Sequence, residues 1–301
     1  MSIGVRRRLV VGISSNLYGQ AVSVIVQLAG VPFLLHSWGT RVYGEWLILF
    51  AIPSYLTMSD LGFSRSVANE MTGAVARGDH VHAVRLFRSL GILTALMVVI
   101  GSGTSGALLP LLPIERWFGL NAITGEAGRM VVWLLGLEVL VGLIDSWMGA
   151  GFRSEADYAL HVGEYNTVRL LQHLALWAAA ILGYGPVGGS IAFVAVRLAA
   201  TPIVAVLLFR RHRWLRHRIR GIRLTELRPL LRPALANVSV PLAQALTMQG
   251  SVLAMGAILG PVSVVVFSTS RTVARLVFQA VSMLGKAAEP ELAAAYGLGD
   301  V

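Results

Sequence analysis

Long apolar runs alternate with short polar segments along the whole chain. The runs are close to the ~20 residues that a helix needs to cross the hydrocarbon core of a bilayer. We therefore expect transmembrane helices near 11–35, 44–68, 86–112, 129–150, 168–184, 187–209, 235–259 and 261–285. This pattern predicts an all-α, polytopic membrane protein with about eight spans. They would form a six-helix bundle followed by the first two helices of a second bundle.

Composition makes lipid the expected solvent of this chain. Of its 301 residues, 55% are hydrophobic and only 13% are charged, and the mean hydropathy is +0.70. Soluble domains carry about 25% charged residues, because charge is what covers a surface that faces water. The sequence holds no cysteine, which excludes disulfides and thiol chemistry. It also shows no P-loop, nucleophile elbow or paired metal ligands within a span, so we expect neither an enzyme nor a cofactor.

Basic residues gather in alternate connections between the expected helices. They precede the first helix, follow the second, flank the connection after the fourth (Arg153 and Arg169) and reach nine arginines between 210 and 232. The positive-inside rule then places the N-terminus and this basic segment on the cytoplasmic side of a bacterial inner membrane. It also explains the net charge of +10 without nucleic acid. We take the N-terminal arginines and the apolar run after them as an uncleaved first helix rather than a signal peptide.

The position of the basic segment suggests two domains. We expect residues 1–220 to form an N-terminal bundle with its cytoplasmic linker, and 221–301 to begin a C-terminal bundle. Asn16–Asp79 and Asn237–Asp300 can be laid over each other without gaps, and Gly39 then matches Gly260. Both segments read as a helix, a short turn, a second helix and a small-residue stretch that ends in Gly-Asp, which indicates an internal repeat.

Polar residues form one face on each of two corresponding helices. Those of the first helix are Asn16, Gln20, Ser23 and Gln27, and those of the seventh are Asn237, Gln244, Thr247 and Ser251. Such a face would not meet lipid, so it lines either a wet cavity between helices or a packed interface held by hydrogen bonds. Both interpretations stay open at this stage.

Charged residues inside the spans are the sharpest functional signal, since each costs roughly 2.5 to 3.5 kcal/mol at a helix centre. Asp60 with Arg65, both on the second helix, could be a structural ion pair or a functional one. Glu138 and Asp145 share one face of the 129–150 helix. Together with Asp60 they are our candidates for ion coupling.

Three arginines and two further acids complete this set. Arg197 would either snorkel or pair with an acid on the 129–150 helix. Arg271 and Arg275 lie one turn apart with no acid within a turn of them, which favours a phosphate-bearing ligand. Glu45 and Glu70 lie near helix ends, so we expect them to be interfacial.

The stretch from Tyr43 to Asp79 resembles the polysaccharide-biosynthesis flippases of the multidrug/oligosaccharidyl-lipid/polysaccharide exporter superfamily. The resemblance is carried by Tyr43-Gly44, Asp60-Leu61-Gly62-Phe63, Ala68-Asn69 and Gly78-Asp79. It implies a two-bundle, alternating-access carrier that moves polyprenyl-pyrophosphate-linked oligosaccharide across the inner membrane for surface polysaccharides such as O-antigen lipopolysaccharide. Members of that family have more helices in two matched halves, so we expect this chain to lack the C-terminal ones.

The resemblance also implies a central, often cationic cavity lined by the first, second, seventh and eighth helices. Combined with the residue patterns, it gives the expected substrate-binding residues Arg65, Arg271, Arg275, Asn16, Gln20, Gln27, Asn237 and Gln244. The expected partners are the pyrophosphate headgroup of the lipid-linked oligosaccharide, membrane lipids and glycan-assembly proteins. A cation-coupled drug antiporter, which Glu138 and Asp145 favour, a membrane glycan polymerase or ligase and a non-transporting scaffold are the alternatives.

Overall fold

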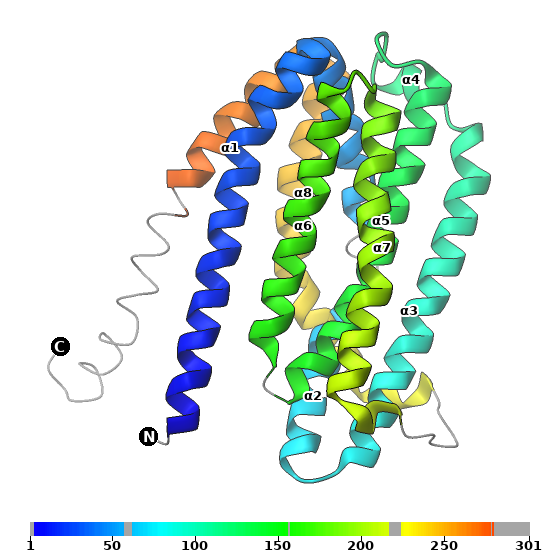
Figure 1. Cartoon of the computed structure of the whole chain (residues 1–301). Helices are drawn as coiled ribbons and strands as arrows, with labels where there is room; N and C mark the ends of the chain where they lie inside the picture. The colour runs from blue at the N-terminus through cyan, green and yellow to red at the C-terminus, as the bar shows by residue number, and fades with distance from the viewer. Residues whose placement is uncertain (1–2, 57–61, 156, 217–223, 278, 280–301) are drawn as a thin grey trace, which may run out of the picture.

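The computed structural model describes residues 3–56, 62–155, 157–216, 224–277 and 279, and in this part of the chain helices are joined by short connections, without strands (Figure 1). The α-helices are α1 (Ile3–Ser54), α2 (Phe63–Ala76), α3 (His80–Leu108), α4 (Ile114–Trp117), α5 (Gly125–Ser154), α6 (Tyr158–Ile181), α7 (Pro186–Arg211), α8 (Leu231–Leu259) and a further helix over 261–277. Short 3-10 helices are η2 (Leu109–Leu111), η3 (Arg213–Arg216) and η4 (Leu224–Leu230).

Five of the described helices are long and apolar enough to cross a membrane. They are α1, α3 with η2, α5, α7 and the second half of α8. Large apolar side chains such as Val99, Ile203 and Val266 are more than half exposed on the outside of the bundle. An outer surface of this kind suits lipid and not water. The predicted class, an all-α helical membrane protein, is confirmed.

The boundaries of the second predicted span are wrong, whereas the predicted break before it is present. Helix α1 consists of two helices that meet at Gly39 (φ 75, ψ 166), a non-helical backbone conformation that essentially only glycine adopts, and the second of them ends at Ser54. The predicted 44–68 helix is therefore two pieces: the end of α1, which contains Pro53, and α2, which begins after the left-handed Gly62 (φ 73). An apolar run does not reveal this break, because apolar residues fill both pieces. Asp60 lies outside the described residues.

Helix α6 begins about three turns before the predicted 168–184 span, at Tyr158. Its first half carries His161 and Glu164, which hydropathy assigned to a connection, and Arg169, which was expected at the beginning of the span. Arg169 therefore lies further inside the helix than the flanking position that the sequence predicted. The predicted spans 86–112, 129–150 and 235–259 also begin earlier, at His80, Gly125 and Leu231.

The bundle interior holds two large apolar clusters, one toward each end. One cluster joins α2, α3, α5 and α7 and includes the fully buried Phe87, Phe152 and Leu208. The other joins α1 to α5, α6 and α7 and includes Leu49 and Leu176. Between them, on the facing sides of α5, α6 and α7, lies a layer of polar side chains. The apolar clusters stabilise the three helices around that layer.

The two halves of α1 form a first helical hairpin at Gly39. A second hairpin, formed by α8 and the 261–277 helix, packs on the second half of α1. Ile48 and Ala51 of α1 form a buried cluster with Val252 and Val264. The hairpin turns at Gly260 (φ 80, ψ 176), whose conformation is nearly that of Gly39, the residue it matches in the proposed repeat. This agreement supports the repeat, because a shared glycine-only geometry is not expected of unrelated turns. The division into domains at 220 stays a prediction.

The two ends of the bundle can be separated by labelling. The Trp38 Nε1–H donates to the Tyr184 carbonyl (3.0 Å) at one end, while the Arg88 Nη2–H donates to the Arg216 carbonyl (3.2 Å) at the other. Since the chain has no native cysteine, Tyr184→Cys should react with an impermeant maleimide on intact cells, and Arg216→Cys only after permeabilisation. Labelling of Arg216→Cys on intact cells would reverse the expected orientation.

Candidate functional site

The predicted pair of arginines meets at one residue of the second hairpin. The Arg271 Nη1–H donates to the Met248 carbonyl (2.7 Å), and Arg275 Nη2 lies 3.8 Å from the Met248 sulfur. The Arg271 guanidinium also lies 5.3 Å from the centre of the Phe267 ring. Arg271 is half-buried and Arg275 is exposed. The structure thus brings both guanidinium groups together beside α8, which can place two charged forks on one anion.

The other predicted substrate residues are distributed less closely. Arg65 is exposed near the beginning of α2, a helix that contacts α8; its approach to the arginine pair stays a prediction. Gln244 is exposed on α8, and the side chain of Asn237 lies outside the described residues. The suggested pairing of Arg65 with Asp60 is likewise untested.

The polar face of α1 serves partly as a packing surface. The Arg169 Nη1–H of α6 donates to the Ser23 hydroxyl (2.9 Å), so Ser23 belongs to an interface between helices. Asn16 is exposed and donates to the Gly12 carbonyl of its own helix (2.8 Å). Gln20 and Gln27 are half-buried, and the Gln27 Oε1 atom is buried with no hydrogen-bond partner among the described residues. The cavity interpretation therefore stays open for the glutamines, while Ser23 supports the packing one.

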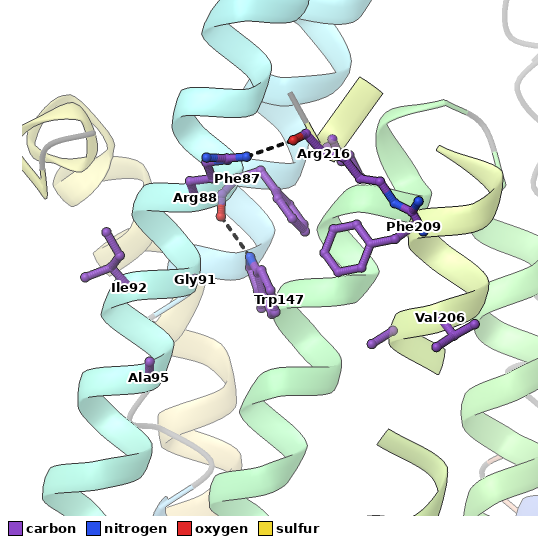
Figure 2. Close-up of a pocket in the computed structure, with 11 residues that line it drawn as sticks. Phe87, Arg88, Gly91, Ile92, Ala95, Trp147, Val206, Phe209 and Arg216 are labelled. Atoms are coloured by element: carbon purple, nitrogen blue, oxygen red, sulfur yellow. Dashed lines mark hydrogen bonds between the residues drawn. The ribbon is translucent and has the colours of Figure 1, made fainter. Parts of the chain in front are cut away.

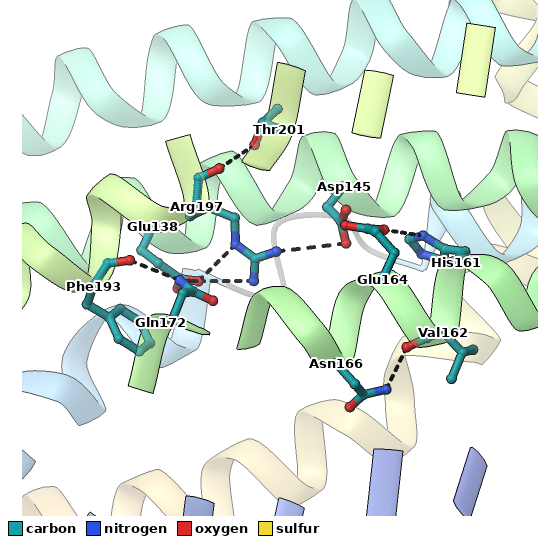
Figure 3. A network of polar contacts seen from close by, with 10 residues as sticks. All are labelled: Glu138, Asp145, His161, Val162, Glu164, Asn166, Gln172, Phe193, Arg197 and Thr201. Atoms are coloured by element: carbon teal, nitrogen blue, oxygen red, sulfur yellow. Dashed lines mark hydrogen bonds and ion pairs between the residues drawn. The ribbon is translucent and has the colours of Figure 1, made fainter. Parts of the chain in front are cut away.

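A buried polar network connects α5, α6 and α7 (Figure 3). Arg197 of α7 is 6% exposed, and its Nη2 lies 3.2 Å from Glu138 Oε1 and its Nη1 3.9 Å from Asp145 Oδ2. The Gln172 Nε2–H of α6 donates to the same Glu138 oxygen (3.2 Å) and to the Phe193 carbonyl (3.3 Å). Arg197 thus pairs with acids of α5 and does not snorkel.

The network continues toward the beginning of α6. His161 Nδ1 lies 3.4 Å from Glu164 Oε2, and ligand atoms of Asp145, His161 and Glu164 all lie within 4.8 Å of one another (Figure 3). The His161 ring stacks on Phe152 with centroids 5.7 Å apart. Carboxylate oxygens and an imidazole nitrogen at this spacing could share a proton or hold a small cation.

Charge is unbalanced in this network. Glu138, Asp145 and Glu164 bring three carboxylates to the single guanidinium of Arg197 within the described part of the chain. Unpaired buried carboxylates are costly in a membrane interior, so protons or a bound cation would offset them. Glu138 and Asp145 thus both belong to this network, and their role in ion coupling stays a prediction.

Sequence reasoning missed His161, Glu164 and Gln172 because it began the helix after the first two. A detectable signal was present, since these residues recur on one helical face when the helix is extended to Tyr158. Their partners could not have been found, because Glu138 and Arg197 lie far from them in the chain. A charged, helically spaced segment between two apolar spans is thus better treated as a candidate inner helix.

No family model and no curated protein matches this chain. One solved structure, described only as "protein A", is similar to it with a TM-score of 0.67 and 18% sequence identity. The match covers 96% of this chain and 66% of that one, so the chain spans less than two thirds of the length of the solved structure. At this identity the likeness shows the fold alone: this chain is folded like a part of a longer protein.

Proposed function

We propose that this chain belongs to an exporter that flips polyprenyl-pyrophosphate-linked oligosaccharide across a bacterial inner membrane by alternating access. The observation that carries the proposal is the convergence of Arg271 and Arg275 on Met248. A guanidinium offers five N–H donors, and Arg271 uses one on the Met248 carbonyl within the described residues. Two such groups side by side suit a pyrophosphate better than a single carboxylate.

The surroundings of the arginines also fit an amphiphilic substrate. The 261–277 helix exposes Val262, Val266, Val273 and Val277 by more than half of their surface. An apolar flank next to a cationic pair offers contact to both a polyprenyl chain and its charged headgroup. The matching glycine turns of α1 and the second hairpin support a carrier built from two repeats, the architecture in which alternating access is common.

Binding of isoprenyl pyrophosphate tests the proposal on the chain as it is. The detergent-purified protein should bind farnesyl pyrophosphate in preference to farnesol. Because a charged hydrogen bond contributes about 1.5 to 3 kcal/mol, Arg271→Ala should weaken this binding roughly tenfold or more. Arg271→Lys should also weaken it, since an ammonium cannot replace a bidentate fork.

An exposed arginine in the first turn of α8, Arg232, provides the matched control. Arg232→Ala removes one positive charge from the same hairpin but should leave the affinity unchanged. Equal affinities of the wild type, Arg271→Ala and Arg275→Ala would mean that the arginines are structural and that this proposal is wrong.

The antiporter alternative has an observation of its own, the buried network of Glu138, Asp145 and Arg197. Coupling sites of ion-driven transporters are commonly buried acids that exchange a proton or cation. Proton-driven efflux of a cationic dye from vesicles, abolished by Asp145→Asn but unaffected by Arg271→Ala, would favour this function over lipid export.

A further inference from the structure

We propose that the groove between α3, α5 and α7 binds an anionic phospholipid, with the phosphate on Arg88 and Arg216 and an acyl chain along α3. The groove has a volume of about 670 Å³, within the range of ligand pockets. The proposal concerns neither the arginine pair on the second hairpin nor the transported molecule, so it does not depend on the proposed function.

The groove is amphiphilic along its length (Figure 2). Arg88 and Arg216 lie at one end, where the Arg88 Nη2–H donates to the Arg216 carbonyl (3.2 Å). The other lining residues are apolar: Phe87, Gly91, Ile92, Ala95, Trp147, Ala205, Val206, Phe209 and Leu215. From Arg88 to Ala95 the lining follows α3 for about two turns, roughly 10 Å. The basic end of the groove suits a phospholipid headgroup, and the apolar lining along α3 suits the first part of an acyl chain.

Contacts with α3 hold Trp147 in place at the floor of the groove. The Trp147 Nε1–H donates to the Phe87 carbonyl (2.8 Å), and the Trp147 and Phe87 rings stack with centroids 4.8 Å apart. A Cβ atom on Gly91 would lie 2.9 Å from the indole, so glycine is what allows Trp147 to lie against α3. With its N–H satisfied, the indole presents only its ring to an occupant.

The mouth of the groove opens toward lipid. Ile92 on α3 and Val206 on α7 are 42% and 49% exposed, and both helices are candidate membrane spans. An occupant therefore enters from the bilayer rather than from water. Of the residues that line the groove in the described part of the chain, none is acidic and two are arginines, which favours an anionic lipid over a zwitterionic one. Basic pockets between spans at the cytoplasmic boundary bind such headgroups in general.

Lipid titration followed by native mass spectrometry tests this site on the full chain in detergent. Phosphatidylglycerol should bind more tightly than phosphatidylcholine with the same acyl chains. Arg88→Ala and Arg216→Ala should each weaken phosphatidylglycerol binding roughly tenfold and remove most of the preference. Arg210→Ala, an exposed arginine at the same end that does not line the groove, should change neither affinity.

The apolar part is tested by filling it. Ala95→Trp should weaken binding of both lipids several-fold, roughly the effect of losing the burial of about one methylene, whereas Val99→Trp, one turn further along α3 and outside the groove, should not. Arg216→Ala keeps the carbonyl that accepts the Arg88 hydrogen bond, so it reports on the headgroup even if Arg88→Ala impairs folding. An equal loss of phosphatidylglycerol affinity in Arg210→Ala and Arg216→Ala, or no preference for phosphatidylglycerol in the wild type, would overturn the proposal.

Discussion

Glu45→Ala should strongly destabilise the chain, by about 3 kcal/mol or more, because it leaves several backbone N–H groups without their acceptor and each unsatisfied buried donor costs about 1 to 3 kcal/mol. The Glu45 side chain is fully buried. Its Oε1 accepts from the backbone N–H groups of Asn121 and Ala122 (2.8 and 2.9 Å), and its Oε2 accepts from that of Ile123 (2.7 Å). Without the carboxylate, these N–H groups lose their partner and the connection before α5 loses its attachment to α1.

The thermal denaturation midpoint in detergent measures this effect. Glu45→Gln should not restore stability, because the amide replaces one acceptor oxygen by an N–H₂ donor facing other donors. Glu70→Ala is the matched control. Glu70 Oε1 lies 3.3 Å from Arg77 Nη2 on the surface, where an ion pair adds at most about 1 kcal/mol to the free energy of unfolding. A loss of stability that is no larger for Glu45→Ala than for Glu70→Ala would contradict the described attachment.

Arg197→Met should have an effect of similar size, about 3 to 5 kcal/mol, because it leaves Glu138 and Asp145 buried without their cation. The double variant Arg197→Met/Glu138→Met should be less destabilised than the sum of the single variants, since it removes both members of the closest pair. Thermal midpoints of the four proteins in the cycle give this coupling energy.

Arg169→Met provides the comparison within the same bundle. Arg169 is half-buried and donates to the neutral hydroxyl of Ser23 (2.9 Å), so its loss should cost less than that of Arg197. Additive effects of Arg197→Met and Glu138→Met would show that the two residues are not energetically coupled, contrary to the geometry of the network.

The fold class followed from the sequence because lipid requires long apolar segments, and these segments are visible locally. The break between α1 and α2 and the early beginning of α6 were not visible in the same way. Apolar residues occur on both sides of a helix break, so they do not reveal it. The polar side chains of His161 and Glu164 indicate a connection unless their partners are known. Glu138 lies on α5 and Arg197 on α7, and hydropathy carries no information about such pairs.

The two glutamates near helix ends illustrate the same limit. Glu45 and Glu70 were both expected to be interfacial from their place near helix ends, but this position does not reveal that the Glu45 side chain is fully buried. Its partners are backbone N–H groups more than seventy residues away in the chain, and backbone donors leave no trace in a residue pattern. Gly260 shows the opposite case, because its match to Gly39 was expected from the repeat and both residues adopt nearly the same conformation.

We propose that Arg271 and Arg275, on the hairpin of α8 and the 261–277 helix, serve the export of a lipid-linked pyrophosphate. Translocation of a fluorescent polyprenyl-pyrophosphate sugar in proteoliposomes tests it most directly, with an impermeant quencher reporting the outer leaflet. The chain, supplied with any further helices that its gene encodes, should exchange the probe between leaflets well above protein-free liposomes. Arg271→Ala/Arg275→Ala should abolish this exchange at equal reconstitution, while Arg232→Ala should retain it. Exchange at the protein-free level, or full exchange by the double variant, would contradict the account.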